Sequence, residues 1–105
     1  MFQFIKNLVD SNDSNLKEVL SSSNVFLVDV RTPEEFASGS AKKAVNIPLN
    51  QIVDQINSFK NKNNIVVFCR SGNRSNMAKN ILKQNGIANV TNGGSLQNVL
   101  KNINF

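Results

Sequence analysis

The chain has 105 residues, of which 40% are hydrophobic and 18% are charged, a size and composition typical of one globular domain. It contains a single Cys and no His. This excludes an intramolecular disulfide, a zinc site made of Cys and His, and catalytic pairs of Ser or Cys with His. We therefore expect one domain over residues 1–105, with residues 1–13 as an N-terminal segment of uncertain structure.

The formal net charge of +5 comes from 12 Lys and Arg residues against 7 Asp and Glu residues. Nine of the 12 are lysines scattered along the chain without a dense basic stripe, which favours a solvated surface over a nucleic-acid site. No apolar run approaches the ~20 residues that span a bilayer, and residues 1–10 lack the pattern of a signal peptide. We expect a cytoplasmic protein, or a periplasmic one if a leader was removed.

Taken in chain order, the first half of the sequence alternates between helix-like and strand-like segments. Residues 2–9 are ambiguous between the two, and apolar residues at helical spacing predict an early helix around residues 16–20. A β-branched and aromatic run at residues 25–30 predicts a buried strand. Residues 32–35 then read Thr-Pro-Glu-Glu, which is typical of a helix start. A weaker strand is predicted at residues 44–47.

The second half continues the alternation. One apolar stripe at helical spacing predicts a helix, and it consists of Leu49, Ile52, Val53, Ile56 and Phe59. Residues 65–68 predict a buried strand. Another stripe predicts the buried face of the next helix, and it consists of Met77, Ala78, Ile81 and Leu82. A weak strand at residues 89–91 and a helix capped by Ser95 follow. This order predicts an α/β fold with a mostly parallel sheet, helices on its faces, and sites beyond the carboxyl ends of the strands.

The loop after the strand at residues 65–68 is the most informative part of the chain. It begins with Cys69 and continues with Arg70, Ser71, Gly72, Asn73, Arg74 and Ser75. Backbone N–H groups of such a loop, the following helix N-terminus and the two arginines all stabilise a thiolate. We therefore expect the pKa of Cys69 to lie below the free value of roughly 8.5. The nearby arginines favour a nucleophile over a small buried hydrophobic residue at this position.

Four segments in the same order resemble the single-domain rhodanese-like sulfurtransferases. They are residues 28–36, 44–48, 69–75 and 92–94, and the resemblance extends from about residue 16 to residue 100. It implies a three-layer fold with a sheet of about five strands and no metal or other cofactor. It also implies that Cys69 is the catalytic residue and carries a sulfane sulfur as a persulfide. Arg70, Ser71, Gly72, Asn73, Arg74 and Ser75 would bind a small anionic donor such as thiosulfate, and a thiol, a protein or cyanide would accept the sulfur.

Loop length favours this chemistry over its alternatives. Related cysteine phosphatases place five residues between Cys and Arg, whereas four residues separate Cys69 from Arg74 here. The shorter ring suits one sulfur atom better than a phosphoryl group. The alternatives are a non-catalytic rhodanese-like binding or sulfur-carrier module and, less favoured, a cysteine phosphatase or arsenate reductase. We expect a monomer or weak dimer that binds neither nucleic acid nor metal.

Four charged residues lie near the first strand and the helix after it. Asp29 and Arg31 are interpreted as a structural pair that supports the site, and Glu34 and Glu35 as helix-start charges.

The chain departs from the family pattern in three places. Gly39 is followed by Ser and Ala instead of His and a β-branched residue, Lys42 and Lys43 replace a Pro-Gly turn, and an aromatic of the last helix is missing. These changes concern loop geometry and the surroundings of the substrate rather than the nucleophile.

Overall fold

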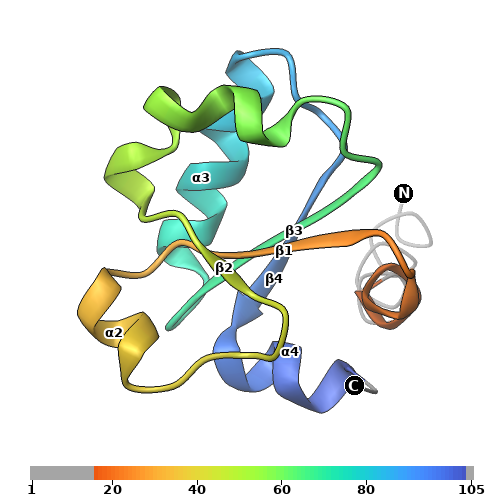
Figure 1. Cartoon of the computed structure of the whole chain (residues 1–105), viewed down its shortest axis with the longest axis vertical. Coiled ribbons are helices and arrows are strands. Elements are labelled where there is room, and N and C mark those ends of the chain that lie inside the picture. The colour runs from red at the N-terminus through yellow and green to blue at the C-terminus, as the bar shows by residue number, and fades with distance from the viewer. Residues whose placement is uncertain (1–15, 104–105) are drawn as a thin grey trace, which may run out of the picture.

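The computed structural model describes residues 16–103, and the statements below concern those residues. Figure 1 shows the alternation of strands and helices that the sequence predicts. The elements follow a helical segment at residues 16–21. They are β1 (Val25–Asp29), α2 (Pro33–Ala37), β2 (Val45–Asn46), the 3₁₀ segments η1 (Leu49–Gln51) and η2 (Val53–Phe59), β3 (Asn64–Cys69), α3 (Asn73–Gln84), β4 (Val90–Ser95) and α4 (Leu96–Asn102). The ambiguous segment at residues 2–9 lies outside the described residues.

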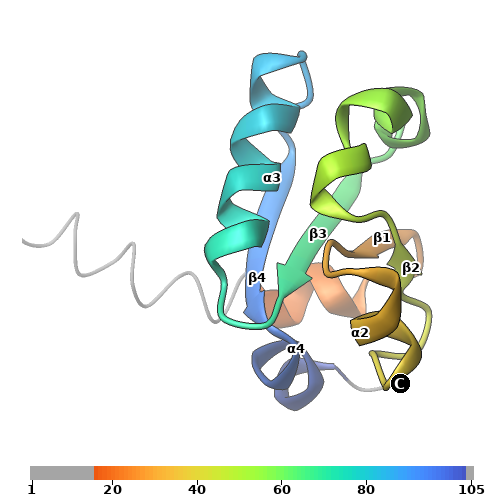
Figure 2. The same cartoon turned by 90° about the vertical axis from the view of Figure 1, so that its left-hand side faces the viewer.

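The four described strands form one sheet in the order β2-β1-β3-β4, with every pair parallel. The resemblance implied about five strands, so the sheet of residues 16–103 is one strand smaller. Because the strands are parallel, their carboxyl ends lie at one edge of the sheet. Figure 2 shows α2, the start of α3 and α4 gathered at the edge to which β3 points.

Two hydrophobic clusters, one on each face of the sheet, make the fold a three-layer α/β arrangement. Alternate residues of β3 point to opposite faces. Ile65, Val67 and Cys69 join the cluster that contains Ala78 and Leu82 of α3. The other cluster lies on the opposite face, and it consists of Leu16, Leu20, Leu27, Ala41, Val66, Phe68 and Val99. The predicted fold class is confirmed, and Cys69 is a core residue of the α3 side.

The structure corrects the helix predicted over residues 49–59. This stretch forms two 3₁₀ segments, and the backbone of Gln55 leaves helical geometry at φ −114°. A 3₁₀ helix has three residues per turn. This spacing alone would place Val53 on the same face as Phe59, but the break at Gln55 interrupts it. Ile52 and Phe59 are buried, while Val53, predicted on the buried stripe, is 59% exposed.

The buried face of α3 also differs from its prediction. The helix buries Ser75, Ala78 and Leu82, whereas Met77 is 54% exposed. Adjacent residues of an α-helix are rotated by about 100° from one another, so a face centred on Ala78 leaves Met77 at its side. Within residues 16–103, the helices are too short and too polar to cross a membrane.

Gly93 is enclosed where β4 packs against α4 and β3. A Cβ atom added there would lie 2.9 Å from Cγ2 of Val99 and 3.0 Å from Cγ1 of Val66. We expect Gly93→Ala to lower the free energy of unfolding by about 1–3 kcal/mol, the usual cost of overpacking a core. Urea unfolding measures this loss. The double variant with Val99→Ala checks the cause, because relief of the contact makes the combined loss smaller than the sum of the single losses. Full additivity would contradict the explanation.

Candidate active site

Cys69 lies at the carboxyl end of β3, one of the two central strands of the sheet. Its side chain is fully buried and belongs to the core cluster on the α3 side. The strand therefore fixes the sulfur at the edge where the loop of residues 70–72 leads into α3. The residues predicted as a donor site follow Cys69 directly in this loop and in the first turn of that helix.

Gly72 turns the backbone of this loop toward the sulfur. It precedes α3 as its N-cap with φ 98° and ψ −10°, a left-handed conformation that glycine adopts without a steric penalty. Its N–H donates to Sγ of Cys69 at 3.0 Å, and the N–H of Ser75 donates at 3.4 Å. A Cβ atom on Gly72 would in addition lie 3.5 Å from Cα of Gly94. The sulfur is thus held by backbone donors at the N-terminus of a helix.

These contacts explain the acidity of the thiol. Burial raises the pKa of Cys69, but hydrogen bonds from the Ser75 side chain and from the N–H groups of Ser75, Ser71 and Gly72 lower it by more. The net pKa lies below the ordinary value, as the loop sequence predicts. A thiolate is the nucleophilic form of cysteine, and these contacts favour that form of Cys69 without an imidazole base.

Asn92, which the sequence analysis noted only as part of a resembling segment, contacts the loop from β4. Its Oδ1 lies 2.7 Å from Oγ of Ser75, and its Nδ2 donates to the carbonyl of Gly72 at 3.3 Å. Oγ of Ser75 also lies 3.5 Å from Sγ of Cys69. A lone Asn before two glycines carries no chemical signal in a sequence, because only the register of β4 against β3 brings it to the loop.

Arg74 forms a bidentate ion pair with Glu35, which the sequence analysis treated as a helix-start charge. Nη1 and Nη2 of Arg74 lie 2.7 and 3.0 Å from the two carboxylate oxygens. Glu35 also completes the capping box of α2 with Thr32. The hydrogen bond from Arg74, followed by the backbone N–H of Thr32, lowers the pKa of Glu35 to about 2. This pair joins α2 to the first turn of α3.

The ion pair predicts a pH-dependent stability. Because the folded-state pKa of Glu35 is depressed from 4.5 to about 2, the stabilisation is present above about pH 5 and is lost as the pH falls toward 2. Gln supports a capping box as well as Glu, so Glu35→Gln removes the charge and keeps the cap. We expect a loss of up to about 1 kcal/mol near neutral pH that vanishes near pH 2. Unfolding curves across this range measure it, with Glu34→Gln as the control, and a pH-independent difference would contradict the assignment.

The expected pairing of Asp29 with Arg31 is present and buried. Nη2 of Arg31 lies 2.7 Å from Oδ2 of Asp29, and Nε lies 2.9 Å from Oδ1. Oδ2 of Asp29 also accepts from Oγ of Ser40 at 2.7 Å, while Nη2 of Arg31 donates to the carbonyl of Gly39 at 2.7 Å. The hydrogen bond to Asp29 raises the pKa of Arg31. Ser40, a departure from the family pattern, therefore donates a hydrogen bond to the Asp29–Arg31 pair. The pair in turn holds the backbone at Gly39.

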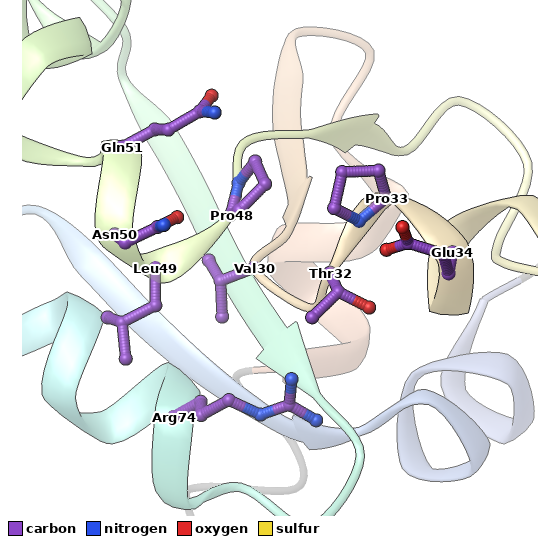
Figure 3. A pocket seen from close by; sticks show the side chains of 9 residues that line it. All are labelled: Val30, Thr32, Pro33, Glu34, Pro48, Leu49, Asn50, Gln51 and Arg74. Atoms are coloured by element: carbon purple, nitrogen blue, oxygen red, sulfur yellow. The ribbon is translucent and has the colours of Figure 1, made fainter.

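Two cavities adjoin the Cys69 loop. One of about 500 Å³ is lined by Arg31, Glu35, Ser38, Arg70, Leu96 and Gln97. The other, of about 350 Å³, is lined by Val30, Thr32, Pro33, Glu34, Pro48, Leu49, Asn50, Gln51 and Arg74. Figure 3 shows Arg74 extending from α3 toward Thr32 in the second cavity. Glu35 lines the first cavity and Arg74 the second, so their ion pair lies between the two. Among residues 16–103, no group of three or more His, Cys, Asp or Glu side chains is placed to hold a metal.

The rhodanese-like domain family matches residues 12–97 of this chain. Thiosulfate sulfurtransferase PspE of Escherichia coli is 36% identical over 74 residues, which cover 69% of this chain and 71% of that protein. A sulfurtransferase of Allochromatium vinosum is 35% identical over 86 residues, which cover 82% of this chain and 79% of that protein. A rhodanese-like domain protein from Staphylococcus aureus is 38% identical, with a TM-score of 0.69 over 84% of this chain and 86% of that structure. The chain therefore belongs to the rhodanese-like sulfurtransferase family.

Proposed function

We propose that this protein transfers a sulfane sulfur from a small anionic donor such as thiosulfate to a thiol, a protein or cyanide, through a persulfide on Cys69. The observation that carries the proposal is the contact of Sγ with the N–H groups of Gly72 and Ser75. These donors lower the pKa of the only cysteine of the chain. The similarity to a protein named as a thiosulfate sulfurtransferase supports the choice of donor.

The reaction proceeds in two displacements at sulfur. The Cys69 thiolate attacks the outer sulfur of thiosulfate, a new S–S bond forms, and sulfite leaves with the electron pair of the broken bond. The acceptor then attacks the terminal sulfur of the Cys69 persulfide, and the Cys69 thiolate leaves. Each step exchanges one bond to sulfur for another and keeps the total charge. The cycle therefore needs neither a metal nor a redox cofactor.

The two arginines of the loop have different roles in this proposal. Arg70 is exposed and lines the larger cavity together with Arg31, so it attracts the donor anion. Arg74 is neutralised in part by Glu35 and holds the first turn of α3. The backbone N–H groups of the loop from Arg70 to Ser75 then bind the negative persulfide. The helix N-terminus favours the same charge.

Intact-mass measurement of the full chain after incubation with thiosulfate tests the proposal. We expect a gain of one sulfur atom that cyanide or a reducing thiol removes, with repeated turnover when donor and acceptor are both present. Loading without turnover would instead support the sulfur-carrier alternative. No gain with any sulfane donor would overturn the proposal in favour of a binding module. Hydrolysis of a phosphate ester or arsenate-dependent turnover would favour the phosphatase or reductase alternative.

A further inference from the structure

Asn92 contacts both residues whose backbone N–H groups hold the sulfur. It lies on β4 opposite Val67, next to the irregularity after which Phe68 pairs with Gly94. Asn92 precedes this irregularity, and the pairing with Val67 brings its carboxamide to the loop. There it contacts Oγ of Ser75 at 2.7 Å and the carbonyl of Gly72 at 3.3 Å. Asn92 is thus linked to Cys69 through Ser75 and Gly72 without touching the sulfur.

Two backbone groups fix the orientation of the Asn92 amide. The N–H of Gly94 can only donate, and it lies 2.9 Å from Oδ1. The carbonyl of Gly72 can only accept, and it faces Nδ2. Exchanging Oδ1 and Nδ2 would break both contacts. The atom that faces Ser75 is therefore the amide oxygen, which is an acceptor.

The position of the Ser75 hydroxyl proton follows from this orientation. A hydroxyl carries one proton, and 2.7 Å is the usual length of an O–H···O hydrogen bond. Two acceptors face this proton, Oδ1 of Asn92 at 2.7 Å and the carbonyl oxygen of Gly72 at 3.1 Å. The shorter contact assigns the proton to Asn92, and Oγ then presents a lone pair to Sγ of Cys69 at 3.5 Å. In this state the thiol can donate its own proton to Ser75. When Cys69 ionises, the Ser75 hydroxyl must turn from Asn92 to donate to the sulfur.

We propose that Asn92 is a positioning residue of sulfur transfer that competes with the Cys69 thiolate for the single hydroxyl proton of Ser75. The inference rests on the proposed function of Cys69. Ser75 is fully buried, so water does not compete for its hydroxyl proton. The carbonyl of Gly72, at the longer distance of 3.1 Å, is the other acceptor that the protein offers it. In the resting state, the hydrogen bond from Ser75 to Asn92 leaves a lone pair of Oγ to accept the proton of the Cys69 thiol. It also sets how readily the thiolate forms before it attacks the donor.

A double-mutant cycle tests the competition. The Cys69 thiolate is titrated by its ultraviolet absorbance, and independently by the pH dependence of its alkylation by iodoacetamide. We expect Asn92→Ala to lower the pKa of Cys69 by about half a unit to one unit, the equivalent of one released neutral hydrogen bond. Asn92→Ser, which keeps a polar group at the strand position, should lower it as well. Ser75→Ala should raise the pKa, and adding Asn92→Ala to that variant should cause no further shift.

Asn98→Ala is the matched control. Nδ2 of Asn98 donates to the carbonyl of Gly93 at 2.8 Å, so this change removes a comparable amide contact from the same part of β4. We expect no shift in the pKa of Cys69. A raised or unchanged pKa in Asn92→Ala, a shift that persists without Ser75, or an equal shift in Asn98→Ala would overturn the inference. The titrations use no sulfur donor, so their outcome is independent of whether the chain takes up sulfur. If it does, the pH profile of sulfur loading should move with the pKa.

Discussion

Replacing Cys69 with Ser is expected to abolish sulfur uptake and to reduce thiosulfate-dependent transfer to the uncatalysed background. The Ser hydroxyl keeps the size and the backbone donors of the site, but it is a weak nucleophile unless an adjacent base removes its proton. The chain has no His, and the groups around position 69 are N–H donors and the Ser75 hydroxyl, none of which is a base that could remove the proton of a Ser hydroxyl. Intact mass after incubation with thiosulfate and a turnover assay measure the two losses.

Two comparisons separate this effect from misfolding. Cys69→Ala has neither the thiol nor the hydroxyl of the Ser variant. It should be as inactive as Cys69→Ser, and equal loss in both would show that the sulfur itself is required. Ser58→Ala, at an exposed position of η2, should load sulfur as the wild type does. Unfolding curves confirm that each variant is folded under the assay conditions. Persistent sulfur uptake in either Cys69 variant would contradict the proposed nucleophile.

The geometry of the loop proposed as nucleophilic could be predicted from sequence because its signal is local. A buried strand, a Cys, a Gly and a helix start follow one another within residues 65–75, and physical chemistry links each of these features to its neighbour. The positive φ of Gly72 and the lowered pKa of Cys69 follow from that order. The same holds for the capping box between Thr32 and Glu35, whose residues are three positions apart.

The remaining contacts depend on tertiary placement. The local signals of Glu34 and Glu35 concern only the start of α2. Nothing in them indicates that Glu35 binds Arg74, a residue 39 positions later. Asn92 reaches the loop because β4 pairs with β3 in a register that places it opposite Val67, two residues before Cys69. The break at Gln55, which accompanies the exposure of Val53, has no signal in the apolar stripe, because the stripe fits periods of both three and 3.6 residues. Sequence periodicity therefore cannot distinguish two 3₁₀ segments from one α-helix over residues 49–59.

The largest expected loss of stability is in Asp29→Ala. Both oxygens of Asp29 accept hydrogen bonds, Oδ1 from the backbone N–H of Arg31 at 3.0 Å and Oδ2 from Ser40 at 2.7 Å, in addition to the guanidinium. The variant leaves that guanidinium buried without its anion, which typically costs about 3–5 kcal/mol. Since small domains are stable by only about 5–15 kcal/mol, we expect a large fall in the midpoint of urea unfolding.

Asp29→Asn and Asp54→Asn define the origin of this loss. Asn at position 29 preserves the shape but removes the charge, so its loss should be smaller than that of Ala. Asp54 is exposed on η2, and Asp54→Asn should change the free energy of unfolding by no more than about 0.5 kcal/mol. A loss below about 1 kcal/mol in Asp29→Ala would show that Arg31 is solvated there, and would contradict a buried pair.

Substitution of Asp29 is also expected to affect the candidate active site. Val30, next to Asp29, donates its backbone N–H to the carbonyl of Phe68 at 3.0 Å, and Phe68 precedes Cys69 in β3. Arg31 in turn holds the carbonyl of Gly39, just beyond the helix that presents Glu35 to Arg74. Loss of Asp29 therefore loosens both ends of α2 beside the loop. We expect the folded fraction of Asp29→Asn to load sulfur more slowly than Glu35→Gln, because the latter releases only the contact with Arg74 and keeps the capped helix in place.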